Sequence, residues 1–551
     1  MSASSKKKLR KEQNEAALTQ KQQAERKEAK QLKKYTVTFI VAMVLVVAIM
    51  VGVIVYPSIN GMIKRGTHAI TIGDHQLSTA QLSYFYMDEI SNYYTETYNN
   101  YYSAYGNMWQ LFLVLNPDEP LNEQEYNDNM TWADHFMDEA IKSATTMYAL
   151  YDDAKANGYT LPDEEQKALD EHFASFETLA NNYGYSNSGA YLRDSYGHGA
   201  NLKEYKEYYT ANVYATSYLG HYSDTLEYTD AQLRDFEKNK LLDYTSFDYA
   251  LYTIRVDNYL GEGKKGENGS VTYTDEQRAA AIAAAQKDAQ TLVSSGATTL
   301  EKLNEAIKAL PINKDNTSAA ATEYNNSFYN TVGLEEIQKW LADENRKAGD
   351  ITSIDGMAEI TNEDGTKTEK VNACNVLLFF ERDDNYTKLV SVRHILSRYT
   401  NPYVDSDGNY QYNESTKKAA KEEAEKYLEE FKKGETTATA FGDLAKKYSD
   451  DSSASYGGLF EDVYPGQMVE AFNDWCFDPN RVAGDTGIVE TEYGCHVMYF
   501  EKTQDTTYRD YLIKQDLVTR DTEAWCTALE KALSVEKVNL SGMEWDFSYN
   551  H

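Results

Sequence analysis

The hydrophobic pattern changes three times along the chain. No charged residue occurs between Tyr35 and Ile63. Residues 35–56 are apolar enough and, at about 1.5 Å per residue, long enough to cross a bilayer core of about 30 Å as one helix. A cleavable signal peptide would have a shorter apolar core and a small-residue cleavage site. We therefore expect a retained transmembrane helix.

The region after the apolar stretch has the pattern of a helical domain. Residues 69–78 are typical of a short strand and turn, and Ser78 can cap a helix that begins near Thr79. Long polar and aromatic helical patterns then continue to about residue 225. These patterns predict a mainly α-helical domain over residues 65–230.

Two further regions, 244–383 and 388–503, are predicted to be copies of one α+β unit. Residues 340–350 and 475–485 share Trp, Asp, Asn, Arg, Ala, Gly and Asp in register. Each copy begins with a strand, continues through helices and ends with a strand. The strands of the first copy contain no histidine, whereas those of the second contain two. Residues 504–551 return to a helical pattern.

Charge is divided unequally between the two ends of the chain. Residues 1–34 carry eleven Lys or Arg and four Glu, a net of 11 − 4 = +7, which predicts a cytoplasmic tail under the positive-inside rule. The total formal charge is −33, so residues 35–551 carry −33 − 7 = −40. This acidic excess argues against a nucleic-acid partner and suits a large extracytoplasmic part.

The cysteines give no redox or metal motif. There are four of them, none in a Cys-x-x-Cys arrangement: Cys374, Cys476, Cys495 and Cys526. They could form any of three full sets of pairs, although unpaired buried thiols are the simpler interpretation. We expect neither a metal site nor a cofactor.

The candidate chemistry lies in the second copy. His394 stands in Val-Arg-His-Ile-Leu, and His496 in Tyr-Gly-Cys-His-Val-Met. Asp451 ends Tyr-Ser-Asp-Asp between them, before Gly-Gln-Met-Val-Glu-Ala-Phe at 466–472. This order resembles the parvulin family of peptidyl-prolyl isomerases, whose paired strand histidines, intervening Asp or Cys and Met/Phe proline pocket occur in the same sequence.

The resemblance implies a set of site residues. His394 and His496 would hydrogen-bond each other on adjacent strands and tune Asp451, which would act electrostatically and without a covalent intermediate. The proline ring would bind against Leu459, Met468 and Phe472, with the nearby Gln467 and Tyr493 also in contact with the substrate. The first copy would keep the parvulin-like fold without isomerase activity.

The strand, turn and helix after the apolar stretch resemble the N-terminal chaperone domain of PrsA, SurA and PpiD foldases. In such foldases the segment after the isomerase unit packs back onto that domain, which we expect for residues 506–535. The sequence as a whole predicts a single-pass membrane isomerase and chaperone that assists newly exported polypeptides with X-Pro bonds. The alternative is a membrane-tethered holdase in which both parvulin-like units only bind clients.

Overall fold

The computed structural model describes residues 59–265, 271–361, 366–405 and 410–543, together with Lys6, Thr38 and Met43. The basic tail at 1–34 and the transmembrane helix expected at 35–56 therefore lie outside the described residues, those three positions excepted. Among the residues that are described, none of the helices is both long and apolar enough to cross a membrane. The chain forms two compact units, Met1–Leu226 with Thr519–His551, and Glu227–Val518.

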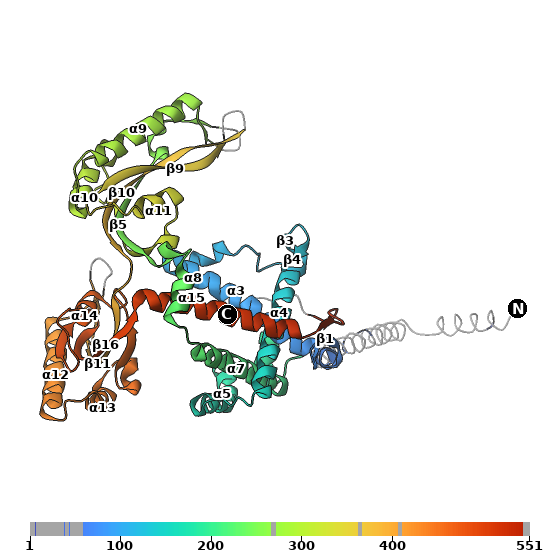
Figure 1. Cartoon of the computed structure of the whole chain (residues 1–551). Helices are drawn as coiled ribbons and strands as arrows, with labels where there is room; N and C mark the ends of the chain where they lie inside the picture. The colour runs from blue at the N-terminus through green and yellow to red at the C-terminus, as the bar shows by residue number, and fades with distance from the viewer. Residues whose placement is uncertain are drawn as a thin grey trace, which may run out of the picture. The chain divides into compact units, whose positions relative to one another are not determined.

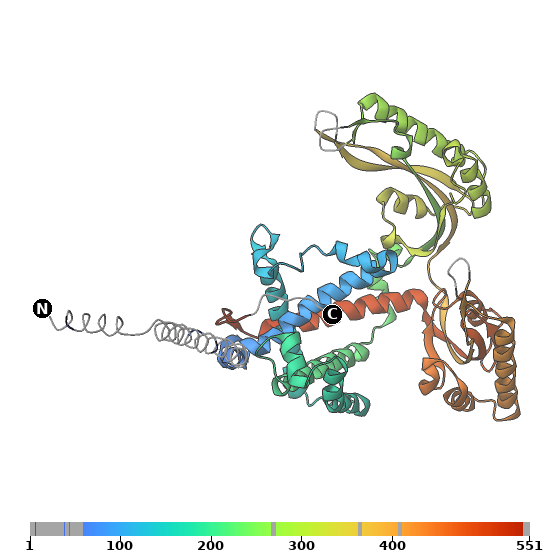
Figure 2. The ribbon, with the colours of Figure 1, turned by 180° about the vertical axis from the view of Figure 1, so that it is seen from behind.

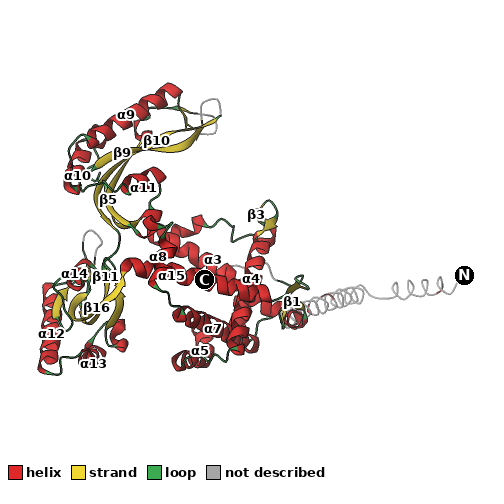
Figure 3. Cartoon of the chain, viewed as in Figure 1, coloured by secondary structure: helices red, strands yellow, loops and turns green. Residues whose placement is uncertain are grey.

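The first unit is mainly helical and opens on a small sheet (Figures 1 and 3). Strands β1 (His68–Ile72) and β2 (His75–Ser78) form a hairpin, and β17 (Val535–Lys537), near the other end of the chain, pairs with β1. Helix α3 (Thr79–Tyr105) follows directly, with Ser78 and Gln81 forming a reciprocal capping box. The predicted Ser78 cap is thus confirmed.

Further helices complete this unit, of which α4, α6 and α7 pack against α3. They and the short elements between them are η1 (Gly106–Phe112), η2 (Leu121–Glu123), β3 (Glu125–Asn127), β4 (Met130–Thr131), α4 (Trp132–Ala156), α5 (Asp163–Asn182), α6 (Ser188–Tyr196) and α7 (Leu202–Thr225). Helix α15 (Tyr508–Ala532) begins in the second unit and ends in the first. There the Trp525 ring stacks on Tyr222 at 3.8 Å.

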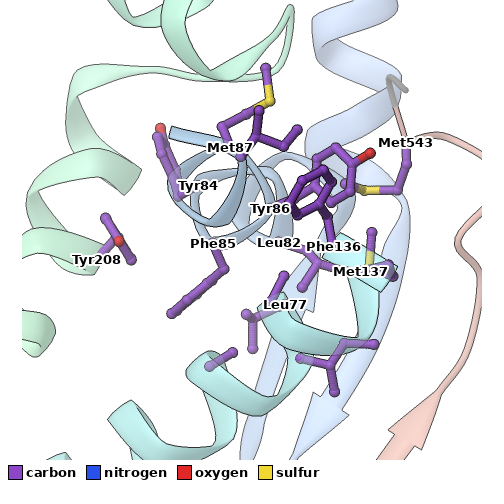
Figure 4. Close-up of a cluster of buried hydrophobic side chains, with 14 of the residues drawn as sticks. Leu77, Leu82, Tyr84, Phe85, Tyr86, Met87, Phe136, Met137, Tyr208 and Met543 are labelled. Atoms are coloured by element: carbon purple, nitrogen blue, oxygen red, sulfur yellow. The ribbon is translucent and has the colours of Figure 1, made fainter. Parts of the chain in front are cut away.

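Tyrosine supplies much of the core of this unit. Tyr84 and Tyr86 are fully buried on α3, and the Tyr84 hydroxyl donates to the Asn201 carbonyl at 3.0 Å. Tyr84 can be buried in this way because its hydroxyl, the one polar atom of the side chain, finds a partner. Figure 4 shows Phe85 pointing away from Tyr86, toward the side of α3 where Tyr208 lies.

The second unit contains two four-stranded antiparallel sheets, each with its own helices. The first sheet has the order β8-β5-β10-β9 and the second β14-β11-β16-β15. In the first copy the elements are β5 (Ser246–Arg255), η4 (Val256–Tyr259), β6 (Lys264–Lys265), β7 (Val271–Thr272), α9 (Asp275–Val293), α10 (Leu300–Ala309), η5 (Pro311–Asn313), β8 (Thr322–Phe328), η6 (Tyr329–Thr331), α11 (Glu335–Leu341), β9 (Ile351–Thr361) and β10 (Lys367–Asp383). Figure 2 shows this copy from behind.

The second copy repeats this order. Its elements are β11 (Lys388–Arg398), β12 (Tyr403–Val404), β13 (Tyr410–Gln411), α12 (Glu414–Lys433), α13 (Ala438–Tyr448), η7 (Ser452–Tyr456), β14 (Leu459–Val463), α14 (Glu470–Cys476), β15 (Thr486–Glu490) and β16 (Gly494–Thr507). Helix α8 (Asp230–Glu237) and η3 (Leu241–Tyr244) precede the first copy. All four cysteines are unpaired, and Cys374, Cys476 and Cys495 are buried.

The repeated segment makes the same contacts in both copies. Arg346 lies 3.9 Å from the centre of the Trp340 ring and donates from Nε to the Trp340 carbonyl at 3.0 Å. Arg481 does the same with Trp475, at 4.1 and 3.0 Å. This stacking and the carbonyl bond need the planar guanidinium of arginine, which explains why Trp and Arg recur at the same spacing.

The repeat also fixes which positions correspond. Gly349 N donates to the Phe379 carbonyl and Gly484 N to the Phe500 carbonyl, each at 2.8 Å. With Phe379 equivalent to Phe500, the strand pairing places Leu251 and Asn375 where the second copy has its histidines. The Thr253 hydroxyl donates to the Asn375 side chain at 2.8 Å. The first copy thus has the strand order of the second without its histidine pair.

Candidate active site

The two central strands of the second copy bring the predicted histidines together. His394 lies opposite Met498, and Leu396 lies opposite His496, so the two histidines are diagonal neighbours on one face of the antiparallel pair. Val392 and Phe500 share that face, which α14 covers. Alternation places Ile395 on the other face, in the core formed with α12 and α13.

The histidines form a direct and buried hydrogen bond. Their Nδ1 atoms are 2.9 Å apart, and His394 and His496 are only 2% and 6% exposed. One ring must donate and the other accept, so both cannot be charged at once. Burial, reinforced by the nearby His394, lowers the pKa of His496 to about 4, so that this ring is neutral at pH 7.

Asp451 and Ser453 occupy the other side of His394. His394 Nε2 is 3.3 Å from Asp451 Oδ1 and 3.1 Å from Ser453 Oγ. The Ser453 hydroxyl and backbone N–H donate to the same carboxylate oxygen at 2.6 and 2.9 Å. The hydrogen bond from His394, together with those from Ser453, holds the pKa of Asp451 well below its usual range, and the carboxylate is therefore ionised.

The neighbouring Asp450 is directed elsewhere. Its carboxylate accepts from the Arg398 backbone N–H at 3.0 Å, and its own N–H donates to the Leu396 carbonyl at 2.9 Å. The sequence could assign Asp451 over Asp450 only by matching a motif. The structure brings Asp451 and not Asp450 to the histidine pair.

Thr491 closes the chain of hydrogen bonds at its other end, with its Oγ1 2.9 Å from His496 Nε2. With Nε2 of His394 donating to ionised Asp451, its Nδ1 can accept from Nδ1 of His496. His496 then accepts at Nε2 from the Thr491 hydroxyl, which itself accepts from the Tyr493 N–H at 3.2 Å. All four ring nitrogens of His394 and His496 thereby have a hydrogen-bond partner.

Apolar side chains stand next to these histidines. The Phe472 ring meets both imidazoles edge-on, at 5.6 Å from His394 and 5.4 Å from His496. Phe460 lies 5.0 Å from His394, and Met468 is half-buried in the same cluster. Met468 precedes α14, which begins at Glu470, so the two pocket residues share a cluster but not a helix.

One residue predicted to contact the proline ring, Leu459, lies on the opposite face of the sheet from the histidines. It pairs with Arg393, whose guanidinium bonds the Gly457 carbonyl and lies against Gly442 of α13. Side chains directly opposite on paired strands share a face. Leu459 is therefore on the α13 face, and Phe460, paired with Val392, is the β14 residue beside the histidines.

Two other predicted contacts lie at the periphery. Gln467 is exposed, and its Oε1 accepts from the Tyr464 N–H at 3.1 Å, which closes the turn before α14. Tyr493 is 52% exposed in the bend before β16, where its carbonyl accepts from the Tyr399 N–H at 3.0 Å. The link between Tyr493 and the histidines is indirect: its backbone N–H donates to the Thr491 hydroxyl, which lies 2.9 Å from His496 Nε2.

Sequence reasoning missed three residues of this site: Ser453, Phe460 and Thr491. Ser453 stands two residues after Asp451, and the Asp451 side chain accepts from its backbone N–H. Aspartate commonly bonds the residue two positions later in a turn, so the sequence could have indicated Ser453. Phe460 required the register of β14. Thr491 is brought to His496 only by the turn between β15 and β16, and no motif marks it.

Comparison with known proteins agrees with this geometry. Residues 376–503 match the family model of the PPIC-type PPIase domain. The predicted parvulin-type peptidyl-prolyl isomerase domain is therefore confirmed, and it includes the whole histidine site.

The relatives are foldases and chaperones. The chain is 32% identical over 109 residues to foldase protein PrsA 1 of Listeria innocua, covering 18% of this chain and 36% of that protein. It is 32% identical over 106 residues to chaperone SurA of Ralstonia nicotianae, covering 17% and 21%. The matched part thus spans about a third or less of these relatives.

A solved structure of PrsA from Bacillus subtilis covers 76% of this chain and 92% of its own, at 15% identity and a TM-score of 0.26. The sequence matches to PrsA 1 and SurA confirm the similarity to foldases that the sequence predicts. The membrane anchor remains a prediction.

Proposed function

We propose that this protein is a membrane-anchored extracytoplasmic foldase whose domain at 388–503 isomerises X-Pro bonds in newly exported polypeptides. The observation that carries the proposal is the hydrogen-bonded series Asp451–His394–His496–Thr491 beside Phe472, in which both histidines are buried. Burying so many polar groups costs free energy unless each finds a partner. A surface that only held unfolded chains would need apolar area and no such network.

The chemistry asked of the site is limited. An X-Pro bond turns against a barrier of about 18–20 kcal/mol because rotation removes amide resonance, and no bond is broken. Phe472, Phe460 and Met468 hold the proline ring and exclude water. The carboxylate of Asp451, oriented by His394 and Ser453, supplies a fixed negative charge that favours the twisted amide over either planar form.

The holdase remains the second candidate, and the first copy favours it in one respect. There Leu251 and Asn375 replace the histidines, and Asn375 bonds Thr253 instead of facing a partner imidazole. A domain of this kind is suited to binding without catalysis. In our proposal the two activities coexist in one chain, with catalysis confined to the second copy.

The test is the exchange of short X-Pro peptides, followed by NMR with the full chain. Wild type would be compared with His394→Ala, Asp451→Ala and, as a matched control, Asn375→Ala in the first copy. We expect acceleration by wild type and the control, and loss in the two site variants. No acceleration by folded wild type, together with suppression of client aggregation, would replace the proposal with the holdase.

A further inference from the structure

A cavity of about 370 Å³ lies within the first unit, between α3, α4 and α7. Its apolar lining includes Phe85, Met147 and Leu150, each less than 8% exposed. Its charged lining consists of Asp88, Glu89, Glu139 and Lys142. The cavity thus combines an apolar wall with an acidic one, and the histidine site does not involve it.

The acidic groups are only partly compensated. Glu139 is 3.6 Å from Lys142, whereas Glu89 accepts a hydrogen bond from the neutral Ser143 hydroxyl at 2.5 Å. Asp88 accepts from the neutral Tyr208 hydroxyl. Three carboxylates therefore face one ammonium group, a formal excess of two negative charges.

Asp88 lies among hydroxyl and carboxylate groups. The groups that act on it are Glu89 on its own helix, Tyr196 on α6 and Tyr208 on α7. Glu139 and Lys142 line the same cavity from α4. Burial raises the pKa of Asp88 to about 6, against the effect of the two tyrosine hydrogen bonds. A positive charge brought close to Asp88 would offset this loss of hydration.

We propose that this cavity binds a lysine or arginine side chain of an unfolded client polypeptide. The aliphatic stem lies along Phe85, Met147 and Leu150, and the charged end meets Asp88 and Glu89. Long basic side chains combine an apolar stem with a charged head, which is the combination that the cavity offers. The inference rests on the proposed foldase function and specifies which client segments the helical unit selects.

Fluorescence anisotropy of the full chain tests it with two labelled, proline-free peptides that differ at one central residue, arginine or its neutral isostere citrulline. We expect the arginine peptide to bind about tenfold more tightly, the size of one charge-assisted hydrogen bond. Asp88→Asn should abolish this preference while keeping an acceptor for Tyr208. Glu139→Gln, at the more exposed rim, should reduce it without risk to the core.

Glu164→Gln on α5 is the matched control, because it removes one exposed carboxylate outside the cavity lining. It should leave the preference intact. Equal affinity for both peptides in wild type overturns the inference, as does a tenfold preference that persists in folded Asp88→Asn and Glu139→Gln. A general charge attraction would instead show Glu164→Gln weakened as much as Glu139→Gln, which also overturns it.

The isomerase assay keeps the two proposals apart. His394→Ala should lose exchange activity and retain the arginine preference, whereas Asp88→Asn should do the reverse. If wild type fails to accelerate exchange but prefers the arginine peptide, the isomerase proposal fails and the cavity stands. If exchange is accelerated and the preference is missing, only the cavity assignment fails.

Discussion

Replacing His496 with glutamine should flatten the pH dependence of stability in the isomerase domain. His496 is 6% exposed, and burial lowers its pKa to about 4, whereas an unfolded histidine titrates near pH 6.5. At pH 7 the ring is neutral in both states and the difference has little effect. As the pH falls from about 6.5, His496 binds a proton in the unfolded chain but not in the folded domain, and the free energy of unfolding decreases.

The magnitude follows from that difference in pKa. Between pH 7 and pH 4 a shift of this size removes about 3 kcal/mol from the free energy of unfolding. Asp451 contributes in a separate window. Its depressed pKa stabilises the folded state above the unfolded value near 4, and that contribution disappears only as the pH falls below about 4.

Hydrogen exchange of the β16 amides is the assay, because it reports the opening of this domain within the full chain. In wild type the opening free energy should decrease by about 3 kcal/mol from pH 7 to pH 4. In His496→Gln most of that decrease should vanish, and His221→Gln in the first unit should behave as wild type. A wild-type profile that is flat over this range, or one that His496→Gln leaves unchanged, would refute the reasoning.

Three further predictions concern other contacts. Asp451→Asn should lower kcat/KM for X-Pro exchange about 10- to 100-fold, since it removes a charged hydrogen-bond acceptor, and an unchanged rate would exclude an electrostatic role. Phe472→Ala should destabilise the domain by about 3–5 kcal/mol, measured by the same exchange experiment, with exposed Tyr493→Ala as control. Arg509→Met should cost about 3–5 kcal/mol in unfolding experiments, because Glu237 loses its fully buried partner at 3.0 Å and keeps only the half-exposed Arg234, and because three backbone carbonyls lose a donor. Glu237→Gln added to it should recover part of that loss, and equal stability of the two variants would contradict this account.

The sequence anticipated most clearly what is determined locally. The repeated Trp–Arg segment could be recognised because a stacked guanidinium, a carbonyl bond and a glycine turn all lie within about ten residues of one another in both copies. The Ser78 cap belongs to the same class. The histidine pair was accessible through a family motif together with the two-residue period of strands.

What the sequence did not anticipate depends on register and on turns. The irregular pairing between Val390 and Val392 sets which β14 residue faces the histidines, and it places Phe460 there instead of Leu459. A slip of one residue exchanges the two faces, so no count along the sequence alone could decide this. The turn that precedes β16 brings the Thr491 hydroxyl to within 2.9 Å of His496 Nε2. This contact depends on the path of the turn in three dimensions, which no sequence motif marks.

The difference between the two copies is an argument about where catalysis can occur. Both copies have the same strand order and the same Trp–Arg contact, so the structural features that define the fold are present in each. In the first copy the polar group at the second histidine position is satisfied internally by Thr253, and the first position is the apolar Leu251. A side chain whose hydrogen bonds are already made within the protein has little to offer a twisted amide. In the second copy the histidines bond each other and orient Asp451, which remains one-quarter exposed and can act on a substrate. We therefore expect isomerase activity from the second copy alone, with the first copy contributing through binding.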